Sequence, residues 1–162
     1  AQSLASQADN RRVWINLRDR FPHPYTLADA HAFIRIVRTS TPETNFAIVV
    51  GAAAVGGIGF ALHDDVERIS AEIGYWLGEA YWGRGIMTEV LAAVKNQAIR
   101  AHDLSRVFAV PYAWNPASAR VLEKAGYVCE GRMRNSAIKD GQVVDQLLYA
   151  YTVPRDPLQG PR

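Results

Sequence analysis

The segment from Gly74 to Glu89, GYWLGEAYWGRGIMTE, constrains the fold of this chain more than any other stretch. Its pattern predicts the end of a strand, a turn that holds Gly83 and Gly85, and the start of a helix. Glycines at such a turn let backbone N–H groups approach a ligand, and the helix N-terminus adds partial positive charge. The arrangement suits a phosphate or pyrophosphate. Taken alone, the two glycines favour the simpler alternative, a tight turn from strand to helix that binds no ligand.

Two common phosphate-binding motifs are excluded at this turn. No Gly-Lys-Ser/Thr sequence follows the glycines, so the segment is not a Walker loop. Thr88 stands where the dinucleotide-binding fingerprint requires its third glycine.

A second polar pair follows the next predicted strand. Asn115 and Pro116 are typical of the N-cap and first residue of a helix, which we expect to run through Lys124 and to stop at Gly126. Ser118 lies three residues after Asn115, so both polar side chains can face the strand ends. Taken alone, they are most simply a capping pair.

The rest of the pattern predicts one domain over residues 1–153 and a tail over 154–162. In the first forty residues we expect two helices joined by a proline-stiffened loop (20–26), with Thr26 and Asp29 as a capping box. Further elements are predicted as strands at 45–50, 55–62, 69–77 and 106–112, a helix at 85–101, and a terminal hairpin around Asp140-Gly141. Strands in series, followed by alternation with helices, predict an α/β (α+β) fold with a mixed sheet between helices.

Composition narrows the class of protein without indicating its chemistry. The 162 residues carry 18 Lys+Arg against 16 Asp+Glu, a net charge of +2 without basic clusters, which argues against a nucleic-acid partner. No apolar run is long enough for a membrane span. Cys129 is the single cysteine and the N-terminus lacks a signal-peptide pattern, so we expect a soluble, cytoplasmic protein. No His/Cys spacing indicates a metal site.

Together, the motifs resemble the GCN5-related N-acetyltransferase (GNAT) superfamily, and within it the RimJ/RimL-like branch that acetylates the N-termini of ribosomal proteins. In that branch a strand G-Y-W-L, a loop Y-W-G-R-G and a helix N-x-x-S-x-x-x-L-E-K-x-G-Y occur in this order and at this spacing. The segment PHPYTLADAHAFI is also similar, and the resemblance covers about residues 10–152. It implies a GNAT-like sheet whose parallel strands, here 69–77 and 106–112, splay apart around acetyl-CoA.

The resemblance implies roles for individual residues. The backbone N–H groups that would hold the pyrophosphate belong to Trp82, Gly83, Arg84, Gly85, Ile86 and Met87. Backbone groups of Trp76 and Leu77 would hold the pantetheine amide and polarise the acetyl carbonyl, as an oxyanion hole does. Asn115 would reach the pantetheine, and Ser118 would hydrogen-bond the leaving thiolate.

The general acid departs from the family pattern. Many members place a tyrosine acid seven residues after Asn115, where this chain has Leu122. We therefore expect Ser118 to stabilise the leaving group. Ala80 stands where many members have Gln or Arg, a change that this branch tolerates.

The general base departs from the pattern as well. Some ribosomal-protein acetyltransferases use a glutamate in the strand after this helix, where Ala137 aligns. Glu72 resembles the strand glutamate of histone-type members, and burial could raise its pKa toward that of a useful base. The alternative, equally weighted, is that Glu72 pairs with Arg68 or another cation on a half-exposed strand face.

The resemblance implies an N-acetyltransferase that moves acetyl directly from acetyl-CoA to a primary amine, on a protein N-terminus or a small molecule, without a metal. The sequence does not identify the acceptor and allows a homodimer. A non-catalytic acyl-CoA-binding or sensing module and a structural domain without a ligand are the alternatives. Family members open with an edge strand before the first helix. This chain begins in that helix, so either the sequence is truncated or the strand is lost, and a partner could cover the exposed edge.

Overall fold

The computed structural model describes residues 1–154, so the tail predicted over 154–162 lies outside the described residues except for Pro154. The helices are α1 (Gln2–Ala8), α2 (Arg11–Trp14), α3 (Leu27–Thr39), α4 (Ile86–His102) and α5 (Pro116–Lys124), with short 3-10 helices at Asp65–Glu67 and Glu79–Tyr81. The strands are β1 (Asn45–Val50), β2 (Ala53–Leu62), β3 (Ser70–Leu77), β4 (Arg106–Ala109), β5 (Val128–Lys139) and β6 (Gln142–Thr152).

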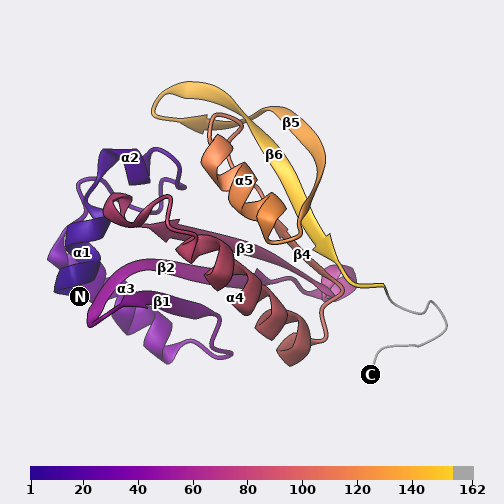
Figure 1. Cartoon of the computed structure of the whole chain (residues 1–162), viewed down its shortest axis with the longest axis horizontal. Coiled ribbons are helices and arrows are strands. Elements are labelled where there is room, and N and C mark those ends of the chain that lie inside the picture. Colours follow the sequence, from indigo (N-terminus) through magenta and orange to yellow (C-terminus); the bar gives the residue numbers. More distant parts are fainter. Residues whose placement is uncertain (155–162) are drawn as a thin grey trace.

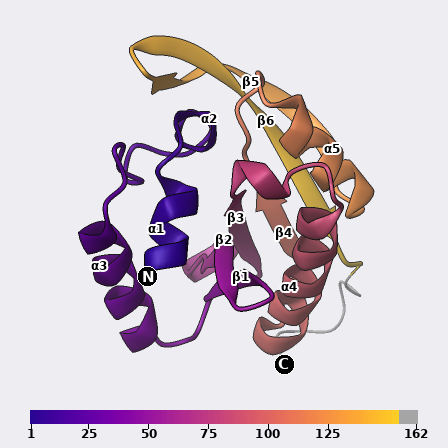
Figure 2. The same ribbon diagram turned by 60° about the vertical axis from the view of Figure 1, so that its left-hand side comes forward.

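Six strands form one mixed sheet in the order β1-β2-β3-β4-β6-β5 (Figure 1). β3 and β4 run parallel, and every other neighbouring pair is antiparallel. α1, with α3 packed against it, covers one face of the sheet, and α4 and α5 cover the other (Figure 2). The predicted fold class, a mixed sheet with helices on both faces, is confirmed.

The parallel strands separate along their length. β3 and β4 pair over three residues only, from Ser70–Arg106 to Glu72–Phe108. β3 continues to Leu77, held there by β2 on its other side, whereas β4 ends with the residue after Phe108. The two strands are therefore hydrogen-bonded at their start and unpaired with each other toward their carboxyl ends, as the predicted splay requires.

β4 is shorter than the strand predicted over 106–112. It ends before Pro111, which has no N–H to donate to a ladder. Tyr112 keeps a single bridge to Gln146 of β6. The chain thus stays beside β6 for a few residues before it turns into α5.

The N-terminal region contains two short helices where the sequence predicted one. Asn10 caps α2, because its side chain accepts the N–H of Arg12 at 2.8 Å. Such a local side-chain bond competes with helix continuation and starts a new helix instead. α2 then ends at Trp14, sooner than the apolar stripe predicted. The capping box of Thr26 and Asp29 at the start of α3 is confirmed.

β3 carries side chains into two separate cores, since successive residues of a strand point to opposite faces. Ile73 and Leu77 join the main core between the sheet and α4 and α5, beside Leu91 and Leu122. Trp76 packs against the smaller core under α1 and α3. β3 is therefore held on both faces up to the residues that precede the glycine turn. Within residues 1–154, every helix is too short or too polar to span a membrane.

Candidate functional site

The glycine turn presents a row of unpaired backbone N–H groups at the head of α4. Gly83 and Gly85 have φ of +74° and +80°, the left-handed region that glycine adopts without strain. Gly85 is the N-cap of α4 and supplies no side-chain cap. The N–H groups of residues 83–88 make no hydrogen bond within the described part of the chain. A row of free N–H groups at the N-terminus of a 17-residue helix favours an anion.

Trp82 differs from the other predicted pyrophosphate residues. Its backbone N–H already donates to the carbonyl of Glu79 at 3.1 Å. Its indole Nε1 donates to the carbonyl of Leu77 at 2.7 Å, which ties the turn to the end of β3. Trp82 thus positions the turn, and the free N–H groups begin one residue later, at Gly83.

The predicted carbonyl-polarising residues, Trp76 and Leu77, lie at the end of β3 where β2 approaches closely. A Cβ on Gly56 of β2 would fall 2.4 Å from the carbonyl oxygen of Trp76, so only glycine fits there. The side chain of Trp76 contacts Phe21 edge to face, with 5.5 Å between the ring centroids. Backbone and side chain are thus fixed independently of any ligand.

Asn115 acts as the helix cap that the sequence favoured. Its Oδ1 accepts the backbone N–H of Ser118 at 3.1 Å. Its Nδ2 makes no hydrogen bond within residues 1–154 and remains available as a donor. Capping therefore uses one end of the amide and is compatible with the predicted contact to pantetheine through the other.

Ser118 has a partner that the sequence did not indicate. Its Oγ lies 2.8 Å from the hydroxyl of Tyr75 on β3. Burial raises the pKa of the Tyr75 phenol to about 12, against the lowering effect of the bond to Ser118. Tyr75 has the same strand parity as Ile73 and Leu77, which face α4 and α5, and that parity is the signal that could have revealed the contact.

Glu72 lies on the opposite face of β3 from Tyr75, because the two are an odd number of residues apart. Its carboxylate forms an ion pair with Arg18, from the loop after α2. Arg68, the partner named in the sequence alternative, instead donates to the carbonyl of Asp65. The alternative that Glu72 forms an ion pair is confirmed, and its cation is Arg18 instead of Arg68. The structure does not bring Glu72 beside Ser118. Glu72 is the last residue of β3 that pairs with β4, so a substrate that touches both side chains has to lie beyond this pair, where the two strands are separate.

The tip of the β5–β6 hairpin is fastened to the N-terminal segment (Figure 1). The Lys139 side chain is fully buried, its Nζ donates to Asp19 at 2.8 Å, and it lies 3.6 Å from the ring centroid of Trp14. Arg11 pairs with Asp140 at 2.6 Å. We call these five residues the strap. It joins α2 and the loop that follows it to the tip of the β5–β6 hairpin.

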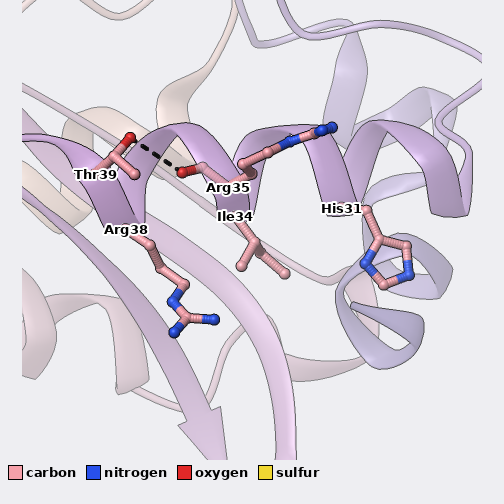
Figure 3. A pocket seen from close by; sticks show the side chains of 5 residues that line it. All are labelled: His31, Ile34, Arg35, Arg38 and Thr39. Carbon is pink, nitrogen blue, oxygen red and sulfur yellow. Dashed lines mark hydrogen bonds between the residues drawn. The ribbon is translucent and has the colours of Figure 1, made fainter.

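Two surface depressions lie outside the predicted site. One runs along α3 and is lined by His31, Ile34, Arg35, Arg38 and Thr39 (Figure 3). The other lies where the loop before Asn115 meets the hairpin, between Trp114, Arg132 and Asp145. Among the described residues, no group of His, Cys, Asp and Glu side chains has the arrangement of a metal site.

A parallel strand pair that separates beside a turn with free N–H groups is the arrangement that the resemblance to the GNAT acetyltransferase fold implies. A family profile described as "Acetyltransferase (GNAT) domain" matches residues 1–128. The chain belongs to this family, and the resemblance noted in the sequence is confirmed.

Similar proteins include N-acetyltransferases of bacteria. The chain is 37% identical over 103 residues to the uncharacterized N-acetyltransferase YoaA of Bacillus subtilis, over 63% of this chain and 57% of that one. It is 30% identical over 96 residues to the ribosomal-protein-serine acetyltransferase of Escherichia coli, over 59% and 53%. The chain spans about half the length of the curated relatives it matches.

Among solved structures, Mycobacterium smegmatis RimJ in complex with a CoA-disulfide superposes with a TM-score of 0.82, at 23% identity, over 93% of this chain and 76% of that one. At this identity the similarity concerns the fold.

Proposed function

We propose that this chain is an N-acetyltransferase that moves the acetyl group of acetyl-CoA directly to a primary amine. The row of unpaired N–H groups at residues 83–88, beside the point where β3 and β4 separate, is the observation that carries the proposal. A cofactor held by backbone N–H groups needs no basic surface, which accords with a net charge of only +2. Family membership and CoA-bound structural relatives support the same cofactor.

The cofactor would be held along the separated strands. The N–H groups of Gly83, Arg84, Gly85, Ile86 and Met87 receive the pyrophosphate, with Trp82 holding the turn in place. The Nδ2 of Asn115 donates to the pantetheine arm. Backbone groups of Trp76 and Leu77 hold the arm and the acetyl carbonyl, where fixed donors stabilise the oxyanion of the tetrahedral intermediate.

Transfer requires a neutral amine and a stable leaving group. A protein N-terminal amine has an ordinary pKa of about 7.7–8.0, so a weak base suffices to deprotonate it. We assign this role to Glu72, directly or through a water, with Arg18 orienting the carboxylate. Glu72 releases this first proton to water. The amine nitrogen then bonds to the acetyl carbon and loses its second proton through the same base, the carbon–sulfur bond breaks with its electron pair passing to sulfur, and the hydroxyl of Ser118 donates a hydrogen bond to the departing thiolate.

The acceptor we favour is a peptide N-terminus, with a small-molecule amine as the second candidate. Relatives named as a ribosomal-protein-serine acetyltransferase and a ribosomal protein uS5-alanine N-acetyltransferase support the first choice. The depression between Trp114, Arg132 and Asp145 offers the residues that follow the amine an aromatic surface and an ion pair, in which Arg132 donates to Asp145 at 2.6 Å.

The test is CoA release from acetyl-CoA with a panel of short peptides and small amines, combined with thermal unfolding in the presence of CoA. A ligand at 100 times its dissociation constant adds about 2.7 kcal/mol to stability, so binding is visible without turnover. We expect both stabilisation and amine-dependent CoA release. Stabilisation without release on any amine would favour the non-catalytic module, and no stabilisation at saturating CoA would overturn both.

A further inference from the structure

The contact between Tyr75 and Ser118 has no role in the acetyl transfer proposed for this site. The two hydroxyls lie 2.8 Å apart and connect β3 to α5, the elements on the two sides of the strand separation. Leu122 occupies the position where many members of the family have an acidic phenol. A phenol nevertheless lies beside Ser118. It belongs to Tyr75, which comes from β3 of the sheet and not from the helix.

The hydroxyl of Ser118 is not used by its own helix. Ser118 is the third residue after the N-cap Asn115, so the residue four positions earlier, Trp114, precedes the helix and offers no helical carbonyl. The Ser118 backbone N–H is already bonded to Asn115. In the part of the chain that the structure describes, Tyr75 is the sole hydrogen-bond partner of Oγ. The direction of this one bond therefore decides where the serine proton points.

Tyr75 is the more favourable donor of the two. Its phenol has no other acceptor among residues 1–154. The nearby Tyr127 hydroxyl is buried and also has no hydrogen-bond partner there, so it does not accept from Tyr75. A half-buried donor without an acceptor costs free energy, whereas the hydroxyl of Ser118, also half-buried, can donate to a ligand. Burial also raises the pKa of Tyr75 to about 12, so the phenol keeps its proton at neutral pH.

We propose that Tyr75 is a positioning residue that donates its phenolic hydrogen to Ser118 Oγ and thereby directs the serine hydroxyl at the sulfur of coenzyme A. This rests on the proposed function. When the tetrahedral intermediate collapses, the carbon–sulfur bond breaks and its electron pair passes to sulfur, which accepts a hydrogen bond from Ser118. Neither Ser118 nor Tyr75 loses its proton, and the proton of the amine leaves through the base.

The test measures thiolate stabilisation directly and needs no acceptor. Coenzyme A labelled with ¹³C at the carbon bonded to sulfur is bound to the full chain, and its NMR shift is followed as pH rises. We expect the acid dissociation constant of the bound thiol to exceed that of free CoA. Tyr75→Phe and Ser118→Ala should each lower it by about tenfold, the effect of one hydrogen bond to a charged group, and the double variant should lower it no further.

Tyr149→Phe is the matched control. It removes a phenol that donates to Glu123 of the same helix at 2.9 Å, away from Ser118, and should leave the constant unchanged. Replacing Tyr75 by 3-fluorotyrosine, a stronger donor, should raise the constant above that of the unmodified protein, a response that a purely structural role does not produce. If CoA binds but the acid dissociation constant of its thiol is the same in Tyr75→Phe and in the fluorinated protein as in the unmodified chain, this proposal alone is overturned. Absence of CoA binding by the unmodified chain overturns the proposed function and this inference with it.

Discussion

At the scale of single residues, Glu72 has two roles open to it, general base and partner of Arg18. Glu72→Gln keeps the shape of the side chain and removes its basicity. If Glu72 accepts the amine proton, kcat should fall by about 10²-fold while KM for acetyl-CoA changes little, because positioned bases contribute on that order. Steady-state CoA release between pH 6 and 9 measures both constants.

Arg18→Gln separates the two roles. It breaks the same ion pair but leaves the carboxylate. If Glu72 is the base, kcat should therefore fall less in this variant, which loses only the orientation that Arg18 gives, than in Glu72→Gln. Glu67→Gln, on the exposed 3-10 helix Asp65–Glu67, controls for a change of net charge. Turnover that is unchanged by Glu72→Gln across the pH range would leave Glu72 with the ion pair alone.

Gly85 is the residue whose backbone the proposed cofactor site depends on most. At a φ of +80°, an alanine costs about 1–2 kcal/mol or turns the chain away from this conformation. Gly85→Ala should therefore weaken CoA binding and lower the free energy of unfolding, measured by calorimetric titration and urea unfolding. Gly131→Ala is the control, because Gly131 has no positive φ and open space around its Cβ position. Equal CoA affinity in both variants would contradict the assignment of the turn.

Which residue-level contacts could be predicted follows from their span along the chain. The capping box at Thr26 and the cap at Asn115 join residues three positions apart, so their geometry follows from local pattern. The Arg18–Glu72 pair spans 54 residues, and the Tyr75–Ser118 pair spans 43. Such pairs arise only when the sheet brings distant segments together, and no spacing rule encodes them.

At the scale of elements, apolar periodicity located the strands and long helices, and its errors lie at their ends. β4 stops short because Pro111 has no N–H to donate to the ladder, which the sequence indicated without fixing the last residue. The N-terminal helix divides at Asn10 because a capping side chain outcompetes a weak apolar stripe. The docking of the hairpin tip on α2 was not predictable, since it depends on how far β5 and β6 extend beyond the sheet.

The strap allows a prediction about how the hairpin tip is held against α2 and the loop that follows it. Asp19→Asn leaves the buried Lys139 cation without its counter-charge, whereas Lys139→Met keeps the volume over Trp14 and leaves a largely exposed carboxylate to water. Breaking a pair is costly when the remaining charge is buried. We therefore expect Asp19→Asn to lower the free energy of unfolding more than Lys139→Met, in urea at pH 7. The opposite order would mean that the cation is reached by water.

Both strap variants should weaken binding of the acceptor more than binding of the cofactor. The strap fixes the hairpin that borders the depression at Trp114, while the glycine turn lies on another element. We expect a raised KM for a peptide acceptor at constant affinity for CoA.

At the scale of the whole molecule, the order of elements along the chain predicted the layers but not the order of strands. β6 inserts between β4 and β5, so the second strand of the hairpin lies inside the sheet and the first strand, β5, forms the edge. A hairpin signal fixes which strands are neighbours and leaves open which of them meets β4. The separation of β3 and β4 came from the family resemblance and could not be obtained from periodicity, which describes one strand at a time.

The tyrosines packed around this sheet determine how the whole molecule responds to alkali. Burial raises the pKa of five phenols: Tyr25, Tyr75, Tyr112, Tyr127 and Tyr149. A group whose pKa is higher in the folded state than in the unfolded state keeps its full stabilising effect below the unfolded value and loses it as pH rises toward the folded value. For Tyr75 and Tyr149 this interval extends from 10.0 to about 12. Burial lowers the pKa of Lys95 below 10.5, so Lys95 acts with the opposite sign but only up to that pH.

We therefore expect the free energy of unfolding to fall steeply between pH 10.5 and 12, after the contribution of Lys95 is complete. Tyr75→Phe and Tyr149→Phe each remove one titrating phenol, so the decline should be shallower in both variants, whatever their stability at pH 8. Urea unfolding followed by circular dichroism at closely spaced pH values gives these slopes. Identical slopes in the unmodified chain and both variants would show that the two phenols ionise alike in the folded and unfolded states. The burial that keeps the Tyr75 phenol protonated, as a donor to Ser118, would then lose its support.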